Sequence, residues 1–265
     1  MCVDGQGPFI FILDSGTSQT TIDAGLAHRL HLATIKPQSG TGVGGCIDQS
    51  SVVTVDSWSL DGLPLAPQTF SADTEPGQGG KEQTDGLLGN DVLSRFGAVR
   101  IDFDPGALVL PGPERAPLGT STFIGPKAPV PAELTKGQGE VVPAEASIGP
   151  VNDYLNVLVR FGDQPSNWFV VDTGTSRTQV DPWVSKEGSL RATDLADSTD
   201  TVCSVLMTPI VQSGSWSMSG RALRPQLVAS GNIGISSIAG ILGADTLAHK
   251  EWVVLDYTGG LVVLG

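Results

Sequence analysis

Two stretches of the chain have nearly the same sequence: FILDSGTSQTTID at residues 11–23 and FVVDTGTSRTQVD at residues 169–181. The second copy lies 158 residues after the first. In each copy an apolar triplet ends at an aspartate, and a hydroxylated residue, a glycine and Thr-Ser follow. The aspartates are Asp14 and Asp172. The repeat predicts two similar halves that each supply one of these carboxylates.

A second pair of stretches fixes the organisation of the chain. DGLLGNDVL at residues 85–93 matches AGILGADTL at residues 239–247, and the match continues without a gap from residue 100 and residue 254. Each half therefore reads as motif, variable stretch, apolar-apolar-Gly strand, short helix and closing hairpin. The sequence predicts an N-terminal lobe at residues 1–112 and a C-terminal lobe at residues 150–265. The Pro- and Gly-rich residues 113–149 are predicted to form a linker.

Composition favours strands over helices. The 265 residues include 34 glycines and 18 prolines, and short runs of Val, Ile and Thr are separated by turn residues. Such a texture is typical of all-β proteins. We therefore expect an all-β fold of two similar lobes, related by a pseudo-two-fold axis, with the active site between them.

Charge excludes several partners. Fifteen Lys and Arg against 28 Asp and Glu give a formal net charge of −13, without a basic cluster. Nucleic acid and an anionic membrane surface would be repelled. No apolar run approaches the roughly 20 residues of a membrane span, and no signal peptide precedes the first motif. The cellular compartment stays open.

Cysteine and histidine offer no metal site. Cys2, Cys46 and Cys203 have no CxxC spacing and are odd in number, which leaves room for one disulfide at most. Two of the three histidines lie in an expected helix after the first motif, without a third ligand nearby. We expect neither metal nor other cofactor.

If the two lobes face each other, the carboxylates of Asp14 and Asp172 come close together. Gly16 and Gly174 let each loop approach its partner without a Cβ clash. Ser15 and Thr173 carry hydroxyls that can reach the opposite loop. Two carboxylates a few ångströms apart cannot both ionise cheaply and share one proton. Such a pair can activate a water and polarise a peptide carbonyl.

The two D-[ST]-G-T-S motifs, with LLG and ILG downstream, resemble the aspartic protease superfamily of pepsins and retroviral proteases. The resemblance spans nearly the whole chain and implies a single-chain, monomeric endopeptidase acting on extended polypeptides. It implies Asp14 and Asp172 as catalytic residues. It also implies two sets of supporting residues: the active-site loops Ser15, Gly16, Thr17, Thr173, Gly174 and Thr175, and the buttressing strands with Leu88, Gly89, Leu242 and Gly243.

The Gly-rich stretch SGTGVGGCI at residues 39–47 resembles the flap that closes over substrate in this family. Its tip comprises Gly42, Val43, Gly44 and Gly45. VQSGSWSMSG at residues 211–220 is the nearest analogue in the second half, so we expect one flap, on the N-terminal lobe. Pepsins place a tyrosine on the flap; the first lobe has none, and Trp58 is a substitute by loose analogy only.

Two further pairs repeat. Asp91 and Asp245 each precede a short expected helix, and an N-cap role explains them. Thr17 and Thr175 each follow the motif glycine, where retroviral proteases usually have alanine. A hydroxyl donating to the outer carboxylate oxygen would lower the carboxyl pKa. This hypothesis predicts an acidic optimum, below about pH 6.

Three other interpretations stay open at this point. The aspartates could cap turns in a duplicated β fold without catalysing anything. The chain could be a catalytically silent binding protein with a protease fold. Finally, the phosphate loop of actin-like and sugar-kinase ATPases also reads apolar-Asp-x-Gly-Thr, although no adenosine-binding glycine motif occurs here.

Overall fold

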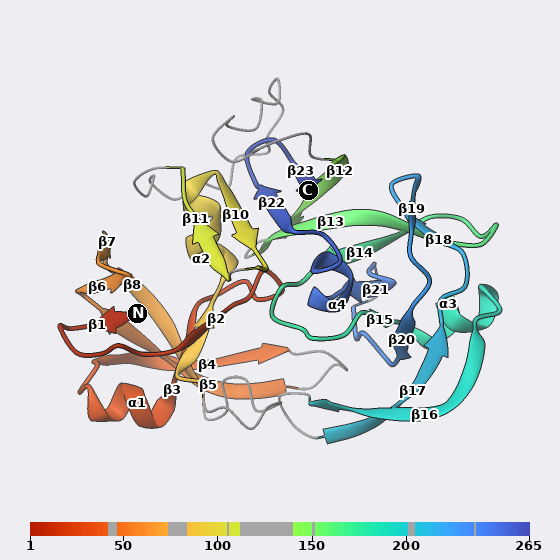
Figure 1. Ribbon diagram of the computed structural model, residues 1–265. Coiled ribbons are helices and arrows are strands. Elements are labelled where there is room, and N and C mark those ends of the chain that lie inside the picture. The colour runs from red at the N-terminus through yellow and green to blue at the C-terminus, as the bar shows by residue number, and fades with distance from the viewer. Residues whose placement is uncertain are drawn as a thin grey trace.

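The computed structural model describes residues 1–41, 47–73, 84–104, 106–111, 140–149, 152–200, 205–235 and 237–265. Within these ranges the chain is mainly β-strand with a few short helices, as its composition predicts. Figure 1 shows two β-rich lobes side by side, the first in red to yellow and the second in green to blue. The expected all-β, two-lobed fold is confirmed.

Lobe one is built on a six-stranded sheet. Its strands, in spatial order, are β2 (Phe11–Leu13), β9 (Gly86–Leu88), β3 (Thr21–Asp23), β8 (Gln68–Asp73), β5 (Ile47–Val55) and β4 (Thr34–Thr41). β2 and β9 run parallel, with Leu13 beside Leu88. Val53 of β5 and Phe70 of β8 are buried in the core. Both residue types suit a pleated, half-buried surface.

A small three-stranded sheet covers one side of this lobe. It consists of β1 (Cys2–Val3), β6 (Trp58–Leu60) and β7 (Leu63–Leu65). The Trp58 ring lies edge-on to Phe70 with centroids 5.0 Å apart, and its Nε1 donates to the Ala66 carbonyl at 2.7 Å. Only 4% of Trp58 is exposed. Trp58 is therefore a core residue, and its analogy to a flap tyrosine is wrong.

Lobe two contains most of a larger sheet. Its main path runs through β11 (Ala107–Val109), β10 (Ala98–Asp102), β22 (Trp252–Asp256), β23 (Leu261–Leu264), β12 (Glu140–Gly149), β13 (Asn152–Phe161), β14 (Asn167–Val171), β21 (Gly240–Leu242), β15 (Gln179–Val180), β20 (Leu227–Ser230), β17 (Val205–Gln212) and β16 (Arg191–Asp200). β18 (Trp216–Met218) pairs with β13, and β19 (Arg221–Leu223) pairs with β18. β14 and β21 are parallel, as β2 and β9 are in lobe one.

The closing hairpins of the two halves join the lobes. β10, from the first half of the sequence, pairs antiparallel with β22, from the second, so that Arg100 lies opposite Val254. The Arg100 guanidinium lies 4.3 Å above the Trp252 ring and 2.6 Å from the Asp102 carboxylate. Backbone hydrogen bonds and a shared core therefore hold both lobes in one frame.

The predicted linker is shorter than expected. Residues 112–139 lie outside the described part of the chain. The last ten residues of the segment form strand β12, which pairs with both β23 and β13. Val142 and Ala144 are buried in it. Alternating apolar residues in VVPAEASI favour a strand, and this local pattern outweighs the Pro- and Gly-rich composition.

Four short α-helices and one 3-10 turn complete the described fold. They are α1 (Ala24–Arg29), α2 (Asn90–Leu93), η2 (Ser94–Phe96), α3 (Pro182–Glu187) and α4 (Ala244–Leu247). Asp23 caps α1 through the Leu26 N–H, and Asp181 caps α3 through the Trp183 N–H. None of the helices in the described ranges has the length and apolar character that a membrane crossing needs.

A third internal repeat becomes evident from the fold. SWSLDGLPLAPQ at residues 57–68 and SWSMSGRALRPQ at residues 215–226 form equivalent hairpins. In the second hairpin, Trp216 Nε1 donates to the Arg224 carbonyl at 2.8 Å, as Trp58 does to Ala66. The VQSGSWSMSG stretch is therefore the counterpart of this core hairpin, and its comparison with the flap is wrong.

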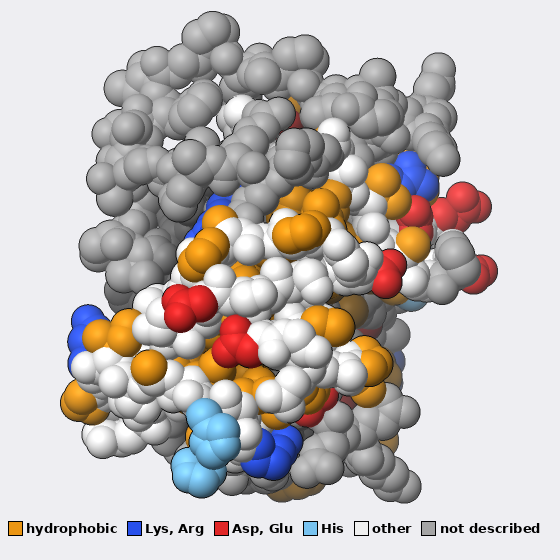
Figure 2. Space-filling model, turned by 90° about the vertical axis from the view of Figure 1, so that its left-hand side faces the viewer, with side chains coloured by type: hydrophobic (Ala, Val, Ile, Leu, Met, Phe, Trp, Pro, Cys, Tyr) orange, Lys and Arg blue, Asp and Glu red, His pale blue; other side chains and the backbone are white. Residues whose placement is uncertain are grey.

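The end of the molecule formed by lobe one is shown in Figure 2. Acidic side chains are interspersed with hydrophobic ones there, and the described basic side chains on this face stand apart from one another. This mixture fits the formal net charge of −13.

We expect Trp58→Phe to destabilise the protein by about 1–3 kcal/mol, because it removes a buried hydrogen bond and shrinks a core side chain. Urea unfolding measures this loss. Trp183→Phe is the matched control, since Trp183 is 42% exposed on α3. If Trp58→Phe leaves the stability unchanged but raises KM, Trp58 contributes to substrate binding instead.

Candidate active site

Asp14 and Asp172 lie at equivalent places in the two lobes. Asp14 follows strand β2 and Asp172 follows strand β14, and each of these strands runs beside a parallel strand, β9 or β21. The Asp14 N–H donates to the Leu88 carbonyl at 3.0 Å, and the Asp172 N–H donates to the Leu242 carbonyl at 3.0 Å. The predicted buttressing strands therefore hold the main chain of each aspartate.

Ser15 and Thr173 connect the loops across the lobe boundary. The Ser15 hydroxyl donates to the Val171 carbonyl at 2.8 Å, and the Thr173 hydroxyl donates to the Leu13 carbonyl at 2.8 Å. Each hydroxyl also accepts from the partner's backbone, at 3.0 Å from the Thr173 N–H and 3.1 Å from the Ser15 N–H. These four crossed hydrogen bonds fix the distance between the two aspartates.

Gly16 and Gly174 make room for the carboxylates. A Cβ atom on Gly16 would lie 2.2 Å from Asp172 Cγ, and one on Gly174 would lie 2.4 Å from Asp14 Cγ. No side chain fits at such distances. Each carboxylate therefore rests against the backbone of the opposite loop, so the structure brings the two predicted catalytic residues together.

The carboxyl groups of Asp14 and Asp172 influence each other's pKa. Burial raises the pKa of Asp14, and the charge of Asp172 and their mutual hydrogen bond raise it further, well above the usual range. Burial also raises the pKa of Asp172, although the hydrogen bonds from Asp14 and from the Gly174 and Thr175 N–H groups lower it in part. The two carboxyls therefore share one proton.

Backbone amides supply the donors that were expected from threonine hydroxyls. The Gly16 N–H donates to Asp14 Oδ1 at 2.8 Å, and the Gly174 and Thr175 N–H groups donate to Asp172 Oδ1 at 2.8 and 3.0 Å. The Thr17 hydroxyl donates to the Gln19 carbonyl instead, at 3.4 Å. The explanation of an acidic optimum through the Thr17 hydroxyl is therefore wrong, and both carboxyl pKa values are raised.

Asp91 and Asp245 brace the loops rather than cap helices. Gly89 and Gly243 are the N-cap residues, and neither helix has a side-chain cap. Asp91 Oδ1 accepts from the Thr20 N–H at 2.9 Å and from its hydroxyl at 2.7 Å. Asp245 does the same for Thr178 at 2.8 and 2.7 Å. The predicted cap role is wrong because these carboxylates face the end of the catalytic loop.

The glycines of the apolar-apolar-Gly strands permit this brace. A Cβ on Gly89 would lie 2.8 Å from the Gln19 carbonyl carbon, and one on Gly243 would lie 2.7 Å from that of Arg177. The Gly89 N–H donates to the Thr20 hydroxyl at 3.1 Å, and Gly243 donates to Thr178 at 3.0 Å. Close backbone contact is therefore the reason for glycine at these positions.

Comparison with known proteins finds a family resemblance in the first part of the chain. Residues 1–92 match the family model described as aspartyl protease. The match covers 92 of the 265 residues and agrees with the resemblance of the two aspartate motifs to the pepsin and retropepsin superfamily. A crystal structure of a retropepsin-like aspartic protease from Rickettsia conorii is similar at 14% identity and a TM-score of 0.36. That match covers 48% of this chain and 89% of the other.

No curated protein sequence matches the chain. Within the described residues the fold is all-β, as the aspartic protease interpretation predicts. Among the described residues, no group of three or more His, Cys, Asp or Glu side chains is arranged to hold a metal ion. Cys2 is a free thiol, whereas Cys46 and Cys203 lie outside the described residues.

Each lobe carries a long hairpin beside the loop that holds its aspartate. These are β4–β5 in lobe one and β16–β17 in lobe two, and Figure 1 shows them extending toward each other. The expected flap tip, Gly42, Val43, Gly44 and Gly45, lies outside the described residues. Residues 191–212 lack the glycine cluster on which the flap was predicted. The expectation of one flap, on the N-terminal lobe, therefore stays a prediction.

Equivalent side chains tie each hairpin to its loop. In lobe one, Gln38 Nε2 donates to Gln19 Oε1 at 2.8 Å. In lobe two, Arg177 Nε donates to Asp197 Oδ2 at 2.6 Å. The first pair is neutral and the second is charged, so salt should weaken only the tether of lobe two.

Three residues near the pair Asp14 and Asp172 (the dyad) were not identified from the sequence motifs. The Asn90 amide donates to the Ser15 carbonyl at 2.7 Å and accepts from the Tyr257 hydroxyl at 2.5 Å. Burial raises the pKa of Tyr154, and the charges of Asp14 and Asp172 raise it further, while a hydrogen bond with Ser18 lowers it. Asn90 has no repeat partner, because Ala244 stands at the equivalent position. Duplication alone could not reveal it.

The raised pKa of Asp14 predicts a pH-dependent stability. The folded state keeps a proton where the unfolded chain has lost it, so stability falls as pH rises from the ordinary carboxyl pKa through the raised one. Asp14→Asn removes this loss. We expect its Tm to gain on the wild type as pH increases from 4 to 7, by about 2–4 °C for each kcal/mol regained.

Differential scanning calorimetry checks this trend. Asp163→Asn is the matched control, because Asp163 is exposed in the turn before β14. Its Tm should follow the wild type at every pH. If the Tm of Asp14→Asn instead loses ground to the wild type toward neutral pH, the raised pKa of Asp14 is contradicted.

Proposed function

We propose that the chain is an endopeptidase that hydrolyses peptide bonds with a water activated between Asp14 and Asp172. The observation that carries this proposal is the placement of each carboxylate against the glycine of the opposite loop. The family match supports the reaction class. The opposite charge states expected for the two carboxyls give each a separate role.

In the proposed reaction, ionised Asp172 takes a proton from the water, whose oxygen attacks the peptide carbonyl carbon. Protonated Asp14 donates its proton to the carbonyl oxygen, which becomes a hydroxyl of a tetrahedral gem-diol. Asp172 then returns its proton to the amide nitrogen, and the C–N bond breaks. A gem-diol proton passes to Asp14 as the new carboxyl product forms, so the dyad regains its single proton.

The proposed substrate is an extended polypeptide lying between the two hairpins. Strands β4 and β16 each flank a catalytic loop through the Gln19–Gln38 and Arg177–Asp197 tethers. Extended chains pair readily with such hairpins through their main-chain groups. Because one chain supplies both aspartates, we propose a monomer as the active unit. The N-terminal lobe would carry the first aspartate and the C-terminal lobe the second.

The test is cleavage of denatured casein between pH 3 and 8 by the wild type, Asp14→Asn, Asp172→Asn and Asp163→Asn. We expect both dyad variants to lose activity by at least about a thousandfold, while Asp163→Asn keeps it. Activity should fall on the acid side when Asp172 is protonated and on the alkaline side when Asp14 is ionised. Because both pKa values are raised, the optimum should lie above that of two ordinary carboxyls.

The outcomes of this assay distinguish a protease from a catalytically silent binding protein. Wild-type protein that is folded by circular dichroism yet cleaves nothing at any pH would contradict the proposal and favour a silent binding protein. Activity that persists in both dyad variants would place the chemistry elsewhere. Tight binding of a peptide with a central secondary alcohol, lost in the dyad variants, would support the gem-diol geometry.

Tyr154 provides a second test of the same site. Its hydrogen bond with Ser18 and its position within the field of both aspartates place its phenol beside the dyad. We expect Tyr154→Phe to lower kcat/KM about three- to tenfold, mainly through KM, with little change in Tm. Tyr257→Phe is the matched control: it removes the hydrogen bond to buried Asn90 and should lower Tm instead. Equal effects on Tm from both variants would assign Tyr154 a structural role.

A further inference from the structure

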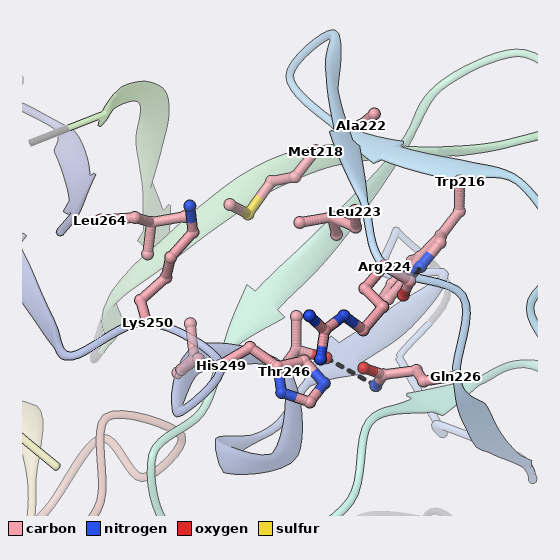
Figure 3. A pocket seen from close by; sticks show the side chains of 11 residues that line it. Trp216, Met218, Ala222, Leu223, Arg224, Gln226, Thr246, His249, Lys250 and Leu264 are labelled. Atoms are coloured by element: carbon pink, nitrogen blue, oxygen red, sulfur yellow. Dashed lines mark hydrogen bonds between the residues drawn. The ribbon is translucent and has the colours of Figure 1, made fainter. Parts of the chain in front are cut away.

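Lobe two contains a cavity away from the catalytic aspartates. It measures about 200 Å³ and lies between the β18–β19 hairpin, the end of α4 and the end of β23. Its apolar wall consists of Trp216, Met218, Leu223, Leu247 and Leu264. Figure 3 shows Met218 and Leu223 in the space between Lys250 and Arg224. The cavity is large enough for a small organic molecule and too small for a folded domain.

The equivalent space in lobe one has a phenylalanine at a key position. β10 and β22 begin at the equivalent residues Ala98 and Trp252, two positions after Phe96 and Lys250 respectively. Phe96 is 2% exposed and belongs to the same hydrophobic core as Trp58 and Leu65. Lobe two has Lys250 in its place, so no ring supplies that apolar volume. Phe96 is therefore a buried core residue of lobe one, whereas its counterpart Lys250 lines the cavity of lobe two.

Basic residues border the cavity of lobe two. Arg224, His249 and Lys250 line it, whereas the equivalent residues in lobe one are Ala66, Arg95 and Phe96. The lining residues include neither Asp nor Glu. Two of the chain's 15 Lys and Arg residues therefore meet at one cavity of a protein with a formal net charge of −13. Figure 3 shows the Arg224 and Lys250 side chains on different sides of the apolar centre.

We propose that this cavity binds a small organic carboxylate with a compact apolar body. The apolar part would lie among Trp216, Met218 and Leu223, where burial from water favours it. The carboxylate would lie toward Arg224, whose N–H groups can donate charge-assisted hydrogen bonds. The His249 ring can add a further contact at the same edge. This inference does not depend on the proposed protease activity.

Two sources offer this chemistry. One is a free medium-chain fatty acid, and the other is the C-terminus of a peptide that ends in an apolar residue. Octanoate represents the first and N-acetyl-leucine the second. Their neutral counterparts, 1-octanol and N-acetyl-leucinamide, have the same apolar parts without the negative charge.

Binding is measured by isothermal titration calorimetry and by amide chemical shifts in the Asp14→Asn protein, so that turnover cannot interfere. We expect saturable binding of at least one of the two acids, with shifts at residues 216–224 and 247–250. Its neutral counterpart should bind at least about tenfold more weakly, because it lacks the charge-assisted hydrogen bonds. The stronger acid identifies the source.

Three variants locate the site. Arg224→Ala introduces the residue of lobe one at an exposed position and should weaken binding about tenfold. Lys250→Phe fills the cavity in the way Phe96 fills lobe one and should abolish binding. Lys186→Ala, which removes an exposed charge from α3 outside the cavity, should leave binding unchanged.

Several results would overturn the proposal. These are the absence of saturable binding by both acids, equal affinity for acids and neutral counterparts, or binding that survives in both Arg224→Ala and Lys250→Phe. If Lys250→Phe fails to fold, the exposed Arg224→Ala variant and the neutral probes still decide the outcome.

Discussion

The whole site depends on holding two carboxyl groups together that would repel each other if both were ionised. The crossed hydrogen bonds of Ser15 and Thr173 fix the loops at a distance where one proton must be shared. Glycine at positions 16 and 174 is required because each carboxylate occupies the space of a side chain. The raised pKa values follow from this geometry together with burial. The active site therefore maintains an electrostatic cost that the surrounding fold must offset.

The lobes offset that cost by sharing structure at several levels. The β10–β22 pairing joins the two closing hairpins, and β12 adds residues between the lobes to the same sheet. Asp91 and Asp245 hold the ends of the two aspartate loops through Thr20 and Thr178. The loops are thus fixed at their beginnings by parallel strands and at their ends by the carboxylates of Asp91 and Asp245. Preorganisation of this kind keeps the reacting groups in place without further rearrangement.

The departures from symmetry are as informative as the symmetry. Asn90 and Tyr257 form a cross-lobe link on one side only, and Tyr154 approaches the dyad from β13 alone. Lys250 stands where lobe one has Phe96, and a cavity bordered by basic side chains results. After a duplication, equivalent positions carry the same backbone demands, so their side chains can diverge wherever packing permits. The differences between the lobes therefore lie in side chains rather than in the backbone plan.

The sequence by itself determined the duplicated all-β plan and the two aspartate loops, because these rest on local patterns: an apolar strand, a turn that needs glycine, and a buttressing strand. It also indicated that Ser15 and Thr173 would reach across, since a hydroxyl beside each aspartate has few other partners. Only the tertiary structure decided what depends on contacts between distant segments. Asp91 and Asp245 brace loops instead of capping helices, Trp58 packs in the core, and a second hairpin faces the first. The protonation of the dyad belongs to the same group, since a carboxyl pKa is set by burial and by the nearest charge, which here comes from a residue 158 positions away.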